Sequence, residues 1–164
     1  MKKELIEKIL SYDSITYAGE NLFCVEKNGK YGFINKKGEE VIPRVYARAN
    51  KFSEKLASVK KGGKWGFINT EGQVVIPFIY NSAGVFVEGL ARVGVFGKNG
   101  FIKCGYIDKN GEKVIPFDYE IACNFSEGFA HFEKIDENNV KGGLINKNVE
   151  VVISLNYEVV NNFY

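Results

Sequence analysis

Short apolar stretches separated by glycine turns recur along almost the whole chain. One example runs through residues 56–59, 65–68 and 74–77, with Gly62-Gly63 and Gly72 in the intervals. Runs of this kind, rich in aromatic and β-branched residues, predict strands, and glycine or Asn-Gly between them predicts tight hairpins. We therefore expect each such segment to form a three-stranded meander.

The meander repeats about four times, and its anchor is an aromatic residue followed by glycine. The anchor occurs at Tyr31-Gly32 and Trp65-Gly66, and in altered form at Cys104-Gly105 and Gly142-Gly143, so that the glycines are 34, 39 and 38 residues apart. The first three copies continue to Val-Ile-Pro. A tyrosine and a phenylalanine follow in every copy: Tyr46, Tyr80, Tyr119 and Tyr157, then Phe52, Phe86, Phe125 and Phe163.

The fourth copy departs from this pattern at two positions. Val149 stands in place of the turn glycine, and Ser154 stands in place of the proline. A terminal repeat that receives no neighbour is expected to vary in this way.

The Lys-Trp-Gly anchor, the glycine turn, Val-Ile-Pro and the Phe-x-Glu-Gly-Leu-Ala stretch together resemble the WG-repeat family of bacterial proteins. The resemblance covers residues 12 to 164 and is strongest from Leu56 through Pro77. It implies β-structured repeats that serve as interaction or structural modules and have no defined catalytic site.

A single meander has too little apolar surface to be stable in water, so the tyrosine and phenylalanine of each linker should cover an adjacent unit. We expect a mainly β fold of tandem three-stranded meanders in an open solenoid-like array, with a small closed four-bladed propeller as the alternative. The predicted domain covers residues 1–164, with repeats over 12–43, 44–77, 78–116 and 117–164. A short capping helix is predicted over residues 1–11, because Leu5, Ile6, Ile9 and Leu10 share one helical face.

Composition narrows the class of protein. With 45% hydrophobic and 26% charged residues, the 164-residue chain has an ordinary globular balance, and its formal charge of +2 indicates neither a nucleic-acid partner nor a membrane partner. The three cysteines are odd in number and far apart, which favours a reducing compartment over a disulfide framework. Because no secretory signal is evident at the start, we expect a cytoplasmic protein.

One variable column of the repeat holds Cys24, Ser58, Arg92 and His131. A position that accepts four such different residues is expected to face solvent, and in stacked repeats it would form a binding stripe. A catalytic role for His131, the only histidine, is disfavoured. We predict no metal site and no cofactor, since no Cys-x-x-Cys exists and the histidine has no partner at ligand spacing.

A second column holds four recurring glutamates, Glu20, Glu54, Glu88 and Glu127. Paired acids can hydrolyse glycosidic bonds. A carboxylate required in every repeat is more consistent with a structural role, and we expect these side chains to accept hydrogen bonds from backbone donors at turns.

Charge is unevenly distributed. Between Arg44 and Lys64 seven cations face the single anion Glu54; we take Arg44, Arg48, Lys51, Lys60, Lys61 and Lys64 as a basic patch. From Asp118 to Val140 six acids face only Lys134. Such polarity could steer a protein partner or favour head-to-tail self-association.

These observations predict a non-enzymatic protein–protein interaction or structural module. The alternative is a small-ligand or glycan-binding module that uses exposed aromatic residues. An enzyme would need a pocket outside the repeat pattern, and the insertion over residues 94–103 is the place where one would be sought.

Overall fold

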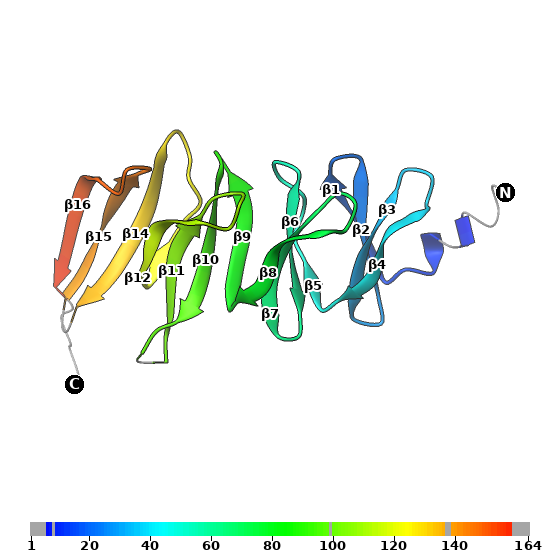
Figure 1. Cartoon of the computed structure of the whole chain (residues 1–164), viewed down its shortest axis with the longest axis horizontal. Helices are drawn as coiled ribbons and strands as arrows, with labels where there is room; N and C mark the ends of the chain where they lie inside the picture. Colours follow the sequence, from blue (N-terminus) through cyan, green and yellow to red (C-terminus); the bar gives the residue numbers. More distant parts are fainter. Residues whose placement is uncertain (1–5, 8, 99, 137–138, 159–164) are drawn as a thin grey trace. The chain divides into compact units, whose positions relative to one another are not determined.

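The computed structural model describes residues 6–7, 9–98, 100–136 and 139–158, with the side chains of 136 and 156–158 left out. This part of the chain is mainly β and contains sixteen strands in four antiparallel sheets of four strands each. In every sheet the strands lie in sequence order, and in the described residues no sheet closes on itself. Figure 1 shows the strands with their labels.

The first two sheets lie at residues 14–46 and 48–80. The first comprises β1 (Ser14–Gly19), β2 (Leu22–Lys27), β3 (Lys30–Asn35) and β4 (Glu40–Tyr46); the second comprises β5 (Arg48–Ala49), β6 (Leu56–Lys61), β7 (Lys64–Asn69) and β8 (Val74–Tyr80).

The third and fourth sheets follow the same plan. The third comprises β9 (Ser82–Val87), β10 (Leu90–Phe96), β11 (Ile102–Ile107) and β12 (Lys113–Tyr119); the fourth comprises β13 (Ile121–Ala122), β14 (Phe129–Asp136), β15 (Asn139–Asn146) and β16 (Val151–Glu158). The predicted meander is therefore confirmed as the last three strands of each sheet. The prediction missed the first strand, which the segment before each meander supplies.

The asparagine or aspartate that ends each anchor shapes the turn after it. The Asn35 side chain Oδ1 accepts hydrogen bonds from the backbone N–H groups of Lys37 and Glu39, at 2.9 and 3.1 Å. Equivalent pairs of bonds occur at Asn69, Asp108 and Asn146. At each turn, a short polar side chain therefore accepts the hydrogen bonds of two backbone N–H groups, as strand carbonyl groups do elsewhere in the sheet.

The anchor glycine is required because the outer strand passes directly over it. A Cβ added at Gly66 would lie 2.7 Å from the carbonyl oxygen of Ile76, which is closer than carbon and oxygen can approach. At this point the outer strand bulges: Trp65 pairs with Tyr80 and Phe67 with Ile76, so that the outer strand advances four residues while the anchor strand advances two. Pro77 lies in the bulge, where its missing N–H leaves no ladder bond unmade.

The chain divides into two compact units, Met1–Phe86 and Val87–Tyr164, and the division falls within β9. In the first unit, the first two sheets pack face to face around a core formed by residues from both, among them Phe33, Ile42, Ala57, Val59 and Ile68. In Figure 1 these sheets are the blue-to-cyan and cyan-to-green strands. In the second unit, the third sheet packs in the same way on residues of the fourth.

Linker phenylalanines hold the sheets together, as the repeat pattern predicts. The ring of Phe52 contacts that of Phe33 edge-on with 4.9 Å between centroids, and Phe86 contacts Phe67 at 5.0 Å. In the second unit Phe125 contacts Tyr106 at 5.0 Å. The tyrosines of the preceding column, Tyr46, Tyr80 and Tyr119, are buried as well. The side chain of Tyr157 and the whole of Phe163 lie outside the described residues.

The capping helix predicted over residues 1–11 is not supported. Residues 1–5 and 8 lie outside the described residues, and Ile6 and Leu10 expose 51% and 78% of their surface. The expected apolar helical face is therefore not buried at these positions. The single-domain division and the choice between an open array and a closed propeller stay predictions.

Candidate interaction site

The variable column does not form the expected exposed stripe. Cys24 and Ser58 are buried, with 8% and 0% of their surface exposed, because each lies opposite an anchor-strand phenylalanine on the packed face of its sheet. The Ser58 hydroxyl accepts a hydrogen bond from Asn50 Nδ2 at 2.8 Å. Burial, together with the nearby Glu26 carboxylate, raises the pKa of the Cys24 thiol to about 11. The prediction of a solvent-facing column is wrong for these two residues.

Arg92 and His131, in the same column, are partly exposed. Arg92 Nη1 lies 3.8 Å from Cys104 Sγ, and Cys104 occupies the anchor position that Tyr31 and Trp65 hold in the preceding sheets. His131 Nε2 lies 3.9 Å from a carboxylate oxygen of Glu133. A binding role for Cys24, Ser58, Arg92 and His131 stays a prediction.

The recurring glutamates occupy hairpin turns with left-handed backbone. Their φ values are +50° at Glu20 and +53° at Glu54, Glu88 and Glu127, and the residue after each also has positive φ. Two successive residues of this kind make the tight turn that matches strand twist. The left-handed backbone of these turns is therefore the first constraint on the four glutamate positions.

The carboxylate of Glu88 also performs the predicted role. It accepts a hydrogen bond from the Gly128 N–H at 3.0 Å, in the equivalent turn of the fourth sheet, and pairs with Lys147 Nζ at 3.1 Å. The hydrogen bond from Lys147 outweighs the effect of partial desolvation and lowers the pKa of Glu88. Glu88 thereby joins two turns within the second unit.

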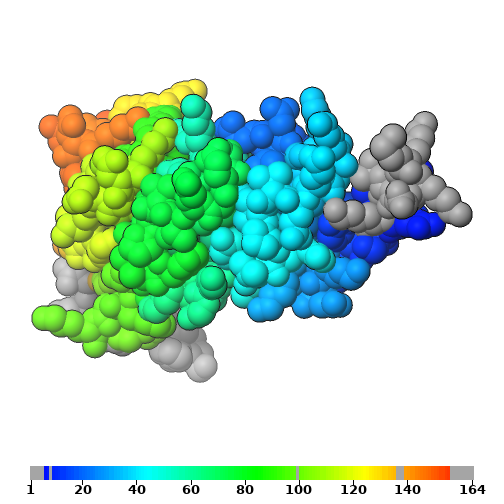
Figure 2. Space-filling model, turned by 45° about the vertical axis from the view of Figure 1, so that its right-hand side comes forward, coloured from blue at the N-terminus to red at the C-terminus, as the bar shows by residue number. Residues whose placement is uncertain are grey.

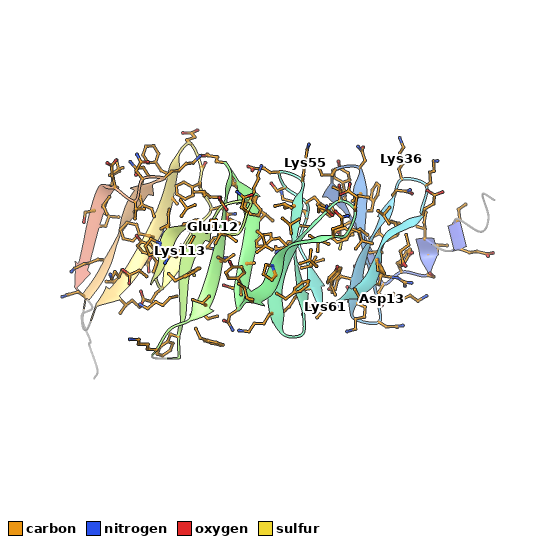
Figure 3. The ribbon with its side chains drawn as sticks, in the orientation of Figure 1. Asp13, Lys36, Lys55, Lys61, Glu112 and Lys113 are labelled. Carbon is orange, nitrogen blue, oxygen red and sulfur yellow. The ribbon has the colours of Figure 1, made fainter. Side chains whose placement is uncertain are left out.

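The predicted basic patch divides into separate parts. Arg48, Lys60 and Trp65 lie opposite one another on β5, β6 and β7, and we call them the Trp65 row. Arg48 Nη1 donates to the Tyr31 hydroxyl at 3.1 Å. Figure 3 shows Lys55 and Lys61 at opposite ends of the second sheet.

The other members of the basic patch lie elsewhere. Arg44 pairs with Glu40 at 3.0 Å, and its guanidinium lies over the Tyr12 ring, 5.3 Å from the centroid. Lys61 lies opposite Lys64 at the hairpin, and Lys51 is exposed. The seven cations therefore do not make one continuous charged face.

The acidic stretch is partly neutralised by lysines. Lys134 pairs with Asp118, and Lys103 pairs with Glu120. Burial raises the pKa of Glu120, but hydrogen bonds from Lys103 and from the Ile135 N–H outweigh this effect, so that the pKa is lowered overall. These pairs weaken the charge polarity that the sequence predicts.

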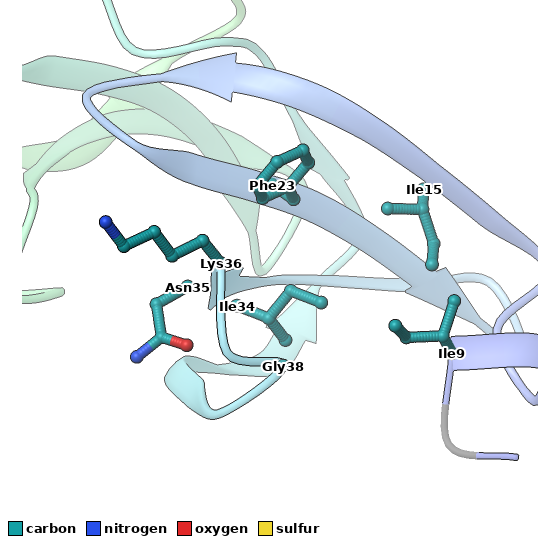
Figure 4. A pocket seen from close by; sticks show the side chains of 7 residues that line it. All are labelled: Ile9, Ile15, Phe23, Ile34, Asn35, Lys36 and Gly38. Atoms are coloured by element: carbon teal, nitrogen blue, oxygen red, sulfur yellow. The ribbon is translucent and has the colours of Figure 1, made fainter. Parts of the chain in front are cut away.

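Two small pockets lie in separate units. The first, about 160 Å³, is lined mainly by Ile9, Ile15, Phe23 and Ile34, whose side chains gather on the outer face of the first sheet (Figure 4). The second, about 240 Å³, lies on the fourth sheet and the end of β12; its lining includes Asp118, Tyr119, Phe132, Lys134, Gly142 and Ser154. Both are smaller than the pockets of roughly 300–1,000 Å³ that enclose small ligands.

The fourth sheet leaves open a face that is buried in the other three. Its members are Phe129, Leu144 and Ile153, which we call the open face. Phe129 is 41% exposed, whereas Leu22, Leu56 and Leu90 in the same column are 6–8% exposed. Ile153 is 49% exposed, whereas Ile42, Ile76 and Ile115 are at most 1% exposed. Leu144 is partly exposed, whereas Phe33, Phe67 and Tyr106 are fully buried.

The open face is an apolar surface built from the columns that join sheets elsewhere in the chain. In the first unit the same columns of the first sheet pack against Phe52, Ala57 and Val59 of the second. In Figure 2 the orange segment, which includes β15 and β16, lies at the surface. The sequence signal for this face is the loss of glycine and proline in the fourth copy.

Among the described residues, no three histidine, cysteine, aspartate or glutamate side chains are grouped so that they could hold a metal ion. The described part of the chain also has no helix that combines the length and apolarity needed to cross a bilayer.

Comparison with known proteins identifies the repeat and the fold. The sequence profile described as "WG containing repeat" matches residues 10–31, 31–65, 65–98 and 105–134, which is more than half of the chain. The WD40 domain of coronin from Toxoplasma gondii is similar in structure, with a TM-score of 0.51 and 13% sequence identity over 90% of this chain. The match spans 45% of the coronin chain. No curated protein matches the chain.

The coronin likeness concerns the fold alone. WD40 propellers are built from blades, and each blade is a four-stranded antiparallel sheet with its strands in sequence order. The four sheets described above have this blade topology.

Proposed function

The chain belongs to the WG containing repeat family, and from that premise we propose that it is a non-enzymatic protein-interaction module that binds its partner on the open face. One observation carries the proposal. The columns of Phe129 and Ile153 are at most 8% exposed in the first three sheets, but these two residues are 41% and 49% exposed in the fourth.

Burial of the open face would supply binding energy. Covering a large aliphatic or aromatic side chain completely is worth about 1.5–3 kcal/mol, so two half-exposed residues would together contribute about 2 kcal/mol before entropic costs. The partner should present an aromatic residue beside small aliphatic ones, because Phe52, Ala57 and Val59 cover the equivalent face in the first unit. This is the chemistry of a strand or loop with an exposed apolar face.

The perturbed ionisable groups support a non-enzymatic role. Cys24 lies in the core of the first unit, and burial raises the pKa of both Tyr46 and Tyr106. The lowered pKa of Glu88 follows from its bonds to a turn and a lysine. Each of these shifts has a structural cause, and none of these four groups lines either pocket. Tyr119, whose pKa burial also raises, lines the second pocket, and its shift likewise follows from packing in the core of the second unit.

A cytoplasmic location fits the module. Cys24, Cys104 and Cys123 are all free, and Cys123 is exposed. An exposed thiol persists most readily where thiols are kept reduced. Cell fractionation with an antibody to the chain tests this part of the proposal.

Affinity purification from the native host tests the proposal. The tagged chain is compared with Phe129→Glu, which places a charge on the open face, and with Phe101→Glu as the matched control. Phe101 is 69% exposed and lies between β10 and β11, outside the open face. We expect one protein to be recovered with the unaltered chain and the control, and at least about tenfold less with Phe129→Glu. Equal recovery with all three would refute the proposal.

A second candidate, a small-ligand or glycan-binding module, is favoured by the Trp65 row. Trp65 and Tyr31 are partly exposed, and Arg48 and Lys60 lie beside them. Partly exposed aromatic rings beside hydrogen-bond donors suit a sugar or another small polar ligand. Saturable quenching or enhancement of Trp65 fluorescence in a glycan titration would support this candidate, and a flat titration would remove it.

A further inference from the structure

The outer strand of the fourth sheet pairs differently from the other three outer strands. In the first three sheets the outer strand bulges beside the anchor glycine, as β8 does between Ile76 and Tyr80. In the fourth sheet, Gly142 pairs with Leu155, Gly143 with Ser154 and Leu144 with Ile153 without interruption. The regular pairing extends from Leu144↔Ile153 to Asn139↔Glu158.

The residue at the proline position accounts for the difference. Pro43, Pro77 and Pro116 lie in the bulges of β4, β8 and β12, where they remove a backbone donor from the outer edge. Ser154 replaces the proline in β16 and retains its N–H. Bulges and prolines are two of the devices that prevent sheet edges from pairing with other chains. In β16 both the proline and the bulge beside the anchor glycine are missing, and the one register shift that remains lies between Leu144 and Ile145, towards the start of the strand.

The side chains of β16 add a third feature of an edge open to pairing. Val151, Val152, Ile153 and Leu155 are each 41–53% exposed. No charged residue occurs from Val151 to Tyr157. The strand is the last in its sheet, so its outer side meets no further strand of the described residues.

We propose that β16 pairs antiparallel with β16 of a second copy of the chain, so that two fourth sheets join into one continuous eight-stranded sheet in a two-fold dimer. This inference rests on the proposed function, since it names a partner for the fourth sheet. It differs from the head-to-tail association that the charge pattern suggests.

The sequence of β16 favours a second copy of the same strand as its pairing partner. A two-fold axis perpendicular to a strand makes that strand pair with itself in antiparallel fashion, and two-fold dimers are the commonest assemblies. Residues 151–157 of β16 carry no charge, so this segment loses no charge solvation when it pairs with itself. In the register that sets Ile153 opposite Ser154, Val152 lies opposite Leu155 and no two glutamates face one another. The ladder between β15 and β16 would simply continue across the axis.

Sedimentation velocity of the purified full chain tests the dimer. The key variant is Ser154→Pro, which restores the residue that the other three outer strands carry at this position, and Ser154→Ala is its control. We expect the unaltered chain and Ser154→Ala to dimerise with similar dissociation constants. For Ser154→Pro the dissociation constant should rise at least about tenfold, because proline removes an edge donor.

A second variant keeps the test valid if proline disturbs folding of the fourth sheet. Val152→Lys places a charge on the exposed edge strand and leaves every backbone donor in place, and it should weaken the dimer by a similar factor. Hydrogen exchange should show concentration-dependent protection of β16 amides in the unaltered chain and in Ser154→Ala, and weaker protection at the same concentrations in Ser154→Pro and Val152→Lys. An unaltered chain that stays monomeric at every concentration, or a dimer unchanged by both variants, would overturn the proposal.

The outcomes for the two proposals are separable. A monomeric chain that still recovers a host protein through Phe129 removes the dimer and leaves the proposed function standing. A monomeric chain that recovers no protein removes both proposals.

Discussion

The side chain of Phe52 joins the two sheets of the first unit, and its truncation should be strongly destabilising. The ring is 4% exposed and contacts Phe33 edge-on at 4.9 Å, while the Phe52 N–H donates to the Ala18 carbonyl of the first sheet at 2.6 Å. Phe52→Ala removes the ring and keeps the backbone bond. Truncation of a buried phenylalanine to alanine costs about 3–5 kcal/mol, of which the aromatic pair accounts for about 0.5–1.5 kcal/mol. A domain's whole stability is about 5–15 kcal/mol.

Urea unfolding followed by tryptophan fluorescence measures this loss. Trp65 is the only tryptophan in the chain and lies in the same unit as Phe52, so its signal reports unfolding of that unit. Phe52→Leu conserves most of the volume and should cost less than about 1.5 kcal/mol. Ile79→Ala, at a side chain that is 54% exposed, should change the free energy of unfolding by about 0.5 kcal/mol or less. A loss below about 1 kcal/mol for Phe52→Ala would refute the role assigned to the linker phenylalanines.

Four further predictions follow from single positions. With a thiol reagent, Cys123 should react rapidly and the two buried cysteines should react only on unfolding, so rapid reaction of a second thiol would contradict the burial described. Gly66→Ala should destabilise the first unit by about 1–3 kcal/mol in urea unfolding, because the new Cβ meets the backbone of β8. Val149→Gly should stabilise the second unit by about 1 kcal/mol, because a β-branched residue at a φ of +66° is strained; a fall in its melting temperature would contradict this reason. Glu88→Gln should lower the melting temperature at neutral pH. The folded-state pKa of Glu88 lies below its ordinary value of 4.5. The melting-temperature difference between the unaltered chain and Glu88→Gln should therefore shrink as the pH falls below 4.5 and the carboxylate becomes protonated. A difference that stays constant with pH would show that the ionised carboxylate does not stabilise the fold.

Periodicity in the sequence was sufficient to predict the meanders and the residues that join them. The anchors and the phenylalanine column recur because the first three sheets share two requirements. The outer strand needs room to bulge beside the anchor glycine, as at Gly66, and a linker ring packs against the anchor strand, as at Phe67. In the second and fourth sheets the first strand escaped prediction because β5 and β13 are two residues long, which is too short to show a period of two.

The burial of the variable column could not be predicted from the residue types alone. Tolerance of Cys24, Ser58, Arg92 and His131 indicates a surface position when only composition is considered. The structure gives two different reasons for the variation. Cys24 is small enough to pack in the core between the first two sheets, whereas Arg92 lies against the sulfur of Cys104, where an aromatic anchor is replaced by a smaller side chain.

The open face was signalled only indirectly. Val149 and Ser154 identify the fourth repeat as different, but the exposure of Phe129 and Ile153 depends on what covers their sheet. Sequence columns record which residues share a position, and they do not record whether a neighbouring sheet is present. The proposed site therefore depends on how the sheets pack, which the residue types do not specify.

Residue-resolved hydroxyl-radical footprinting tests the central claim, that one apolar face is covered in the second sheet and open in the fourth. The labelling rates of Phe129, Leu144 and Ile153 are compared with those of Leu56, Phe67 and Ile76, which hold the same columns in the second sheet. The measurement is made at high dilution, so that self-association does not protect either set. We expect rapid oxidation of the three residues of the open face and protection of the other three. Equal protection of both sets would contradict the account.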